Sequence, residues 1–135
     1  MIREKFSEYE NRIAAGLVGD GSECFGFDDE LSRDHDWGPA FCLWLTKADF
    51  DTIGTPLQAA LRQLPKEFEG YGPRTESAWG GGRVGVFEIG QFYRKFIGMD
   101  RTPQNLMEWR RIPLLTPTAV KMRSFFAVPS GEFTA

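Results

Sequence analysis

Two short groups of residues in the first 40 positions could bind a phosphorylated substrate together with metal ions. Gly21 and Ser22 lie in the sequence GDGS, where backbone amides and a hydroxyl can converge on phosphate oxygens. Asp34 and Asp36 lie two positions apart, so on an extended segment their carboxylates point to one face, roughly 7 Å apart. Hard cations such as Mg²⁺ or Mn²⁺ bind through such acids and substrate phosphates. These residues predict phosphoryl or nucleotidyl transfer.

The other residues of this acidic segment are predicted to have less direct roles. FDDEL, residues 27–31, has the composition of a solvated loop. His35 would point away from the two aspartates, towards the core or a second shell of ligands. A zinc site made by His35 with Cys24 and Cys42 is disfavoured, because structural zinc requires four ligands at short spacings.

These motifs resemble those of a known superfamily. Gly21-Ser22, Gly26 and Asp34-His35-Asp36-Trp37 resemble the GS and D-x-D elements of the polymerase-β-like nucleotidyltransferases. Within it, GSECFGFDDELSRDHDWGPAFCLWL, EWRRIP and GEFTA resemble the bacterial domain of unknown function 4037 family, and the similarity covers essentially the whole chain. The resemblance implies an α/β nucleotidyltransferase fold, nucleotide phosphates at Gly21 and Ser22, and two metal ions at Asp34 and Asp36.

The resemblance also implies a third acid on a neighbouring strand. Glu88 is the candidate, because it lies in the apolar sequence VGVFEI, where an unpaired carboxylate would be costly. Glu69 and Glu76 remain alternatives, as does the lack of any third acid. A purely structural ion pair between Glu88 and an arginine of the following helix is equally compatible with the sequence.

Other parts of the superfamily pattern concern the leaving group and the acceptor. Candidates for neutralising the leaving diphosphate are Arg83, Arg94 and Lys95. The similar proteins continue past GEFTA into a helical domain, which this sequence does not contain. We therefore expect a homo-oligomer or a separate helical partner to complete the unit.

Hydrophobic patterning predicts the elements that position these residues. Strands are predicted at residues 14–18, 40–46, 83–89 and 124–128. Helices are predicted at residues 3–13, from Pro56 with Thr55 as its cap, at 91–98 ended by Gly98, and at 103–111 opened by Pro103. The pattern favours a single α/β (α+β) domain over residues 1–135, with a mixed sheet of about four or five strands flanked by helices.

Composition limits the partners. The chain has 135 residues, 41% of them hydrophobic, and a net charge of −3, which fits a compact domain and disfavours binding to nucleic acid through its phosphates. No apolar run reaches about 18 residues, so no membrane span is expected, and a cytoplasmic location is the default. The expected partners are a nucleoside triphosphate and an unidentified hydroxyl or phosphate acceptor. The alternative is a nucleotide- or partner-binding module that keeps the fold without turnover.

Overall fold

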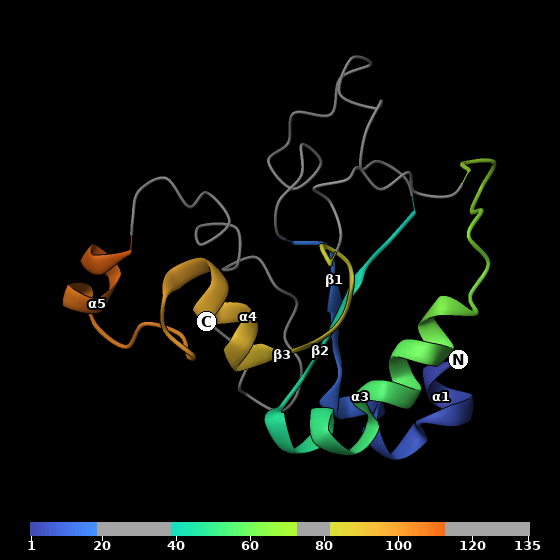
Figure 1. Ribbon diagram of the computed structural model, residues 1–135, viewed down its shortest axis with the longest axis horizontal. Coiled ribbons are helices and arrows are strands. Elements are labelled where there is room, and N and C mark those ends of the chain that lie inside the picture. Colours follow the sequence, from blue (N-terminus) through green and yellow to red (C-terminus); the bar gives the residue numbers. More distant parts are fainter. Residues whose placement is uncertain (19–38, 73–81, 113–135) are drawn as a thin grey trace.

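The computed structural model describes residues 1–18, 39–72 and 82–112, which form a three-stranded mixed sheet with helices on both faces (Figure 1). The strands are β1 (Ala14–Gly16), β2 (Cys42–Leu45) and β3 (Gly85–Glu88), in the order β1-β2-β3. Strand β1 runs antiparallel to β2, and β2 runs parallel to β3. The three strands predicted up to residue 89 are confirmed. The expected total of four or five is wrong for the described residues, and the candidate strand at 124–128 lies outside them.

Strand β2 forms the centre of the core because its side chains are buried on both faces of the sheet. Cys42 and Trp44 pack with residues of helix α4 (Ile89–Ile97), and the Trp44 ring meets the Phe92 ring edge-on at 5.3 Å between centroids. Leu43 and Leu45 pack on the opposite face, where α1 and α3 lie (Figure 1). All four β2 side chains are buried, and Leu43 and Leu45 each contribute about 1.5–3 kcal/mol of hydrophobic stabilisation. This explains the uninterrupted apolar run in the sequence.

Helix α3 (Lys47–Arg62) begins nine residues earlier than the predicted start at Pro56. Its cap is Thr46, whose hydroxyl oxygen accepts a hydrogen bond from the Asp49 amide at 3.3 Å, rather than Thr55. Pro56 lies inside the helix, where it removes the bond to the Thr52 carbonyl at a cost of about 3 kcal/mol. Both residues are exposed, so water can reach that carbonyl. Continuation is favoured by buried side chains on the other face, namely Ile53, Leu57 and Ala60.

The N-terminal segment is less regular than the predicted helix at residues 3–13. It forms one short helix, α1 (Ile2–Lys5), followed by a 3₁₀-helix, η1 (Ser7–Arg12). Phe6 separates the two with φ −138° and ψ 37°, outside the helical region. The apolar side chains of Phe6 and Tyr9 nevertheless pack against the core cluster between β2 and α3. The hydrophobic pattern of this segment therefore predicted burial correctly, but not the type of helix.

The helices after β3 agree more closely with the sequence pattern. Helix α4 ends at Gly98, whose φ of 73° is the left-handed conformation that glycine adopts readily, as predicted. Helix α5 (Leu106–Arg111) begins after Asn105 rather than at Pro103. Within the described ranges, none of the helices has the length and apolar character needed to cross a bilayer.

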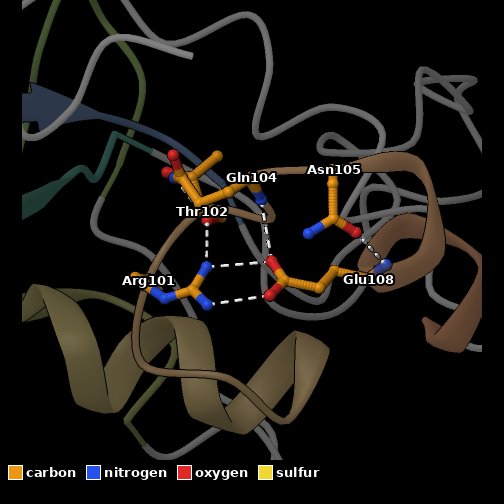
Figure 2. Close-up of polar contacts among 5 residues, drawn as sticks. All are labelled: Arg101, Thr102, Gln104, Asn105 and Glu108. Carbon is orange, nitrogen blue, oxygen red and sulfur yellow. Dashed lines mark hydrogen bonds and ion pairs between the residues drawn. The ribbon is translucent and has the colours of Figure 1, made fainter.

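A polar network fixes the start of α5 (Figure 2). The Arg101 guanidinium donates two hydrogen bonds to the two Glu108 carboxylate oxygens, at 2.8 and 2.9 Å, and the Gln104 amide donates a third at 2.8 Å. The Asn105 side chain accepts from the Glu108 amide at 3.0 Å. The hydrogen bonds from Arg101, and next that from Gln104, lower the pKa of Glu108 from 4.5 to about 2.

This lowered pKa predicts how α5 responds to acid. Because the folded-state pKa lies below the unfolded one, ionised Glu108 stabilises the fold above about pH 4.5, and that contribution is lost as the pH falls towards 2. Thermal melting of wild type should therefore depend more steeply on pH in this window than melting of Glu108→Gln. Glu67→Gln, which removes a carboxylate from another exposed position, should keep the wild-type slope. Equal slopes for wild type and Glu108→Gln would contradict the assignment.

Candidate functional site

Four of the predicted site residues, Gly21, Ser22, Asp34 and Asp36, lie outside the described residues. Before them, the described chain includes strand β1, which ends at Gly16. After them, it resumes with a bend at Pro39, and β2 starts at Cys42. Their assigned roles therefore stay predictions.

Glu88 occupies the end of β3, where it pairs in register with Leu45 at the end of β2. One carboxylate oxygen accepts from the Gly90 amide at 2.7 Å and the other from the Gln91 amide at 2.8 Å, so Glu88 is the N-cap of α4. Among the described residues, Glu88 does not form the suggested ion pair with the arginine of α4. That arginine, Arg94, pairs with Asp100 at 2.9 Å instead. Whether Glu88 also acts as a third acid stays a prediction.

The capping geometry predicts the effect of truncating this side chain. Glu88→Ala removes the acceptors of two amide hydrogen bonds and a negative charge at a helix N-terminus, and should lower the free energy of unfolding by about 1 kcal/mol. Glu88→Ser keeps a capping oxygen and should remain within about 0.5 kcal/mol of wild type. Urea denaturation measures both, and an unchanged stability of Glu88→Ala would show that the cap does not stabilise the fold.

Glu88 lines a small cavity together with two of the predicted basic residues. The cavity has a volume of about 190 Å³, and its polar lining includes Arg83, Gln91 and Lys95. Lys95 Nζ lies 5.0 Å from the centroid of the Phe96 ring, which also lines the cavity. The structure thus brings Arg83, Lys95 and Glu88 together at one face of β3, whereas Arg94 is engaged with Asp100.

A larger cavity of about 780 Å³ lies next to the point where the chain enters β2. Its walls come from the segment before β2, the second half of α3 and the start of β3. The residues that line it include Phe41, Gln58, Leu61, Arg62, Leu64, Lys66, Val84 and Gly85. Gly82 and Phe87 line both cavities, which therefore adjoin at β3. The larger cavity is open to solvent, with both apolar and basic groups on its walls.

Gln58 is held in the larger cavity by a contact that requires glycine at position 85. Its Oε1 atom accepts a hydrogen bond from the Val86 amide at 2.8 Å, across 28 residues of sequence. A Cβ at Gly85, whose φ is 140°, would lie 2.8 Å from the same oxygen. The Gln58 side chain is thus fixed, and no hydrogen bond to another described residue engages the two donors of its Nε2 atom.

Sequence reasoning missed Gln58, Arg62 and Lys66 as members of a site. Basic residues at a helix end are usually solvated, and the pairing of Gln58 with β3 depends on tertiary packing. Gly85 was the available signal, since a glycine inside a strand pattern often marks the close approach of another group. In the described part of the chain, His, Cys, Asp and Glu side chains form no cluster of three or more that could hold a metal ion.

Comparison of the chain with protein-family models, curated proteins and solved structures finds no match.

Proposed function

We propose that the protein is a metal-dependent nucleotidyltransferase, which moves a nucleotidyl group from a nucleoside triphosphate to a hydroxyl or phosphate acceptor. The observation that carries this proposal is the order of three features: the GS turn, the Asp34–Asp36 pair and the buried central strand β2. A solvated acidic loop accounts for Asp28 to Glu30, but it does not account for this order. The motif match is the basis of the proposed fold type as well.

The residues have separate roles in this proposal. Gly21 and Ser22 bind phosphate oxygens of the triphosphate through amide and hydroxyl donors. Asp34 and Asp36 offer the hard carboxylate oxygens that Mg²⁺ or Mn²⁺ prefers. Metal ions held there would neutralise charge on the attacking and leaving oxygens. Arg83 and Lys95 line one cavity, and in this proposal their positive charges attract the leaving diphosphate.

Chain connectivity supports a site near the larger cavity. Pro39 lines that cavity and follows Asp36 by three residues in the sequence. Three extended residues reach at most about 11 Å, so a ligand bound beside Pro39 is within reach of Asp36. Glu88, by contrast, belongs to the end of the sheet at which β2 finishes, about 10 Å along the strand from Cys42.

The position of Glu88 favours a second candidate function. Both of its carboxylate oxygens accept hydrogen bonds from α4 amides, which leaves the third acid of the superfamily pattern without a secure counterpart. A chain that lacks this acid can still bind metal and nucleotide. The second candidate is therefore a nucleotide- or partner-binding module without turnover.

One assay separates the two functions. Radiolabelled ATP, GTP, CTP and UTP are incubated with the protein, cell extract and either Mg²⁺ or Mn²⁺, and transfer of label to an acceptor is followed. Transfer that Glu88→Ser retains supports the enzyme with two acids, and transfer that Glu88→Ser abolishes supports Glu88 as the third acid. Metal-dependent nucleotide binding without transfer supports the module, and a folded protein that shows neither overturns both functions.

A further inference from the structure

The charges on the walls of the larger cavity distinguish it from the rest of an acidic protein. The chain has a net charge of −3, yet among the described residues that line the cavity the charged ones, Arg62 and Lys66, are both basic. Neither forms an ion pair with another described residue. The C-terminal end of α3 contributes about half a negative charge there, so the two cations leave the described part of the wall positive. Charge complementarity therefore favours an anionic ligand.

The remaining walls suit the body of a small organic molecule. Apolar lining comes from Phe41, Leu61, Leu64 and Val84, and Phe41 is 37% exposed. The volume of about 780 Å³ lies within the range of about 300–1,000 Å³ that is usual for small-molecule sites. Gln58 adds a fixed amide, because its oxygen is held by Val86 while its nitrogen can still donate.

We propose that this cavity binds a phosphate ester of mononucleotide size, with the phosphate at Arg62 and Lys66 and a flat apolar body against Phe41 and Leu61. The Gln58 Nε2 group donates to a polar atom of the same ligand. Binding needs no metal ion and does not depend on Asp34 or Asp36. The proposal thus goes beyond nucleotidyl transfer and can fail or succeed separately from it, whether the ligand is the nucleotide donor or a phosphorylated acceptor.

The test uses the full chain in EDTA, with AMP, ribose 5-phosphate and inorganic phosphate as probes. Affinity is measured by calorimetry, and the bound region is located by amide chemical-shift changes in NMR spectra. AMP should shift amides at residues 40–41, 58–64, 66 and 82–87 and should bind more tightly than ribose 5-phosphate. Equal affinities for these two probes would overturn the assignment of the apolar wall to the ligand body.

A matched pair of double variants tests the role of the two cations. Arg62→Gln with Lys66→Gln should weaken AMP binding roughly tenfold or more. Lys5→Gln with Lys47→Gln makes the same change in net charge on α1 and at the opposite end of α3, and should leave AMP affinity unchanged. Equal weakening by both pairs would overturn the proposal in favour of general electrostatic attraction.

The metal-free condition keeps this proposal separate from the proposed function. AMP that binds only with Mg²⁺, and that Asp34→Asn releases, would overturn the cavity proposal and leave nucleotidyl transfer standing. AMP that binds in EDTA to wild type and to Asp34→Asn alike supports the cavity, whatever the transfer assay shows. A wild-type protein that gives no shifts at the lining residues at millimolar AMP overturns the cavity proposal without requiring any variant.

Discussion

Replacing either Asp34 or Asp36 with asparagine is expected to reduce nucleotidyl transfer about 1000-fold. Each change keeps the size of the side chain but removes one of the negative charges that are proposed to hold the metal ions. Metal ions contribute several kcal/mol of transition-state stabilisation in such sites, and a loss of about 4 kcal/mol corresponds to about three orders of magnitude in rate. The measurement is the rate of label transfer from the preferred nucleoside triphosphate at saturating Mg²⁺.

The matched control for this prediction lies in the same acidic segment. Asp28→Asn also removes one carboxylate, but from the FDDEL stretch that is predicted to be a solvated loop. Its transfer rate should remain within about twofold of wild type, since general surface charge has little influence on the chemical step. A comparable loss in all three variants would contradict the assignment of metal binding to the Asp34–Asp36 pair.

Replacing Arg12 with methionine is expected to lower the free energy of unfolding by about 2–3 kcal/mol. Arg12 Nη2 contacts Asp49 Oδ1 in an ion pair between η1 and α3, and the Asp49 side chain is only 4% exposed. The other Asp49 oxygen has no hydrogen-bond partner among the described residues. Removal of Arg12 therefore leaves a buried carboxylate without its counter-ion. Urea denaturation at pH 7 measures the change.

A second substitution tests whether the buried charge is the cause of that loss. Arg12→Met combined with Asp49→Leu removes both charges, and replacement of a buried pair by apolar side chains is often close to neutral. The double variant should recover most of the stability lost in Arg12→Met. Arg3→Met, at the exposed pair of Arg3 and Glu10, should change stability by less than about 1 kcal/mol. A double variant less stable than Arg12→Met would contradict this explanation.

The parts of the fold that were predictable are those whose signals are local. The uninterrupted apolar run at residues 40–46 predicted the central strand, because both faces of β2 are covered by helices. Gly98 predicted the end of α4, because a left-handed residue at that position strongly favours glycine. The predicted start of α3 at Pro56 is too late. The helix-breaking effect of Pro56 is a local signal, whereas the packing of Ile53 and Leu57 that overcomes it depends on the tertiary structure.

The candidate site was predictable only where a motif contained it. The spacing of Asp34 and Asp36 suggested metal binding, and these roles stay predictions. Glu88 is a candidate third acid because a carboxylate in an apolar strand needs a partner. In the structure its partners are two amides of the helix that begins directly after it. The residues around Arg62 and Gln58 carry no signal of their own, since these side chains line a cavity formed by segments far apart in the sequence, and only Gly85 of β3 indicates a close approach there.

Nucleotidyl transfer is tested most directly by the position of the label in ATP. The protein is incubated with cell extract and Mg²⁺, once with ATP labelled at the α-phosphate and once with ATP labelled at the γ-phosphate. The proposed function predicts that the α-label enters an acceptor, that the γ-label leaves as diphosphate, and that Asp34→Asn abolishes the transfer. Transfer of the γ-label, or α-label transfer that Asp34→Asn and Asp36→Asn leave unchanged, would contradict it.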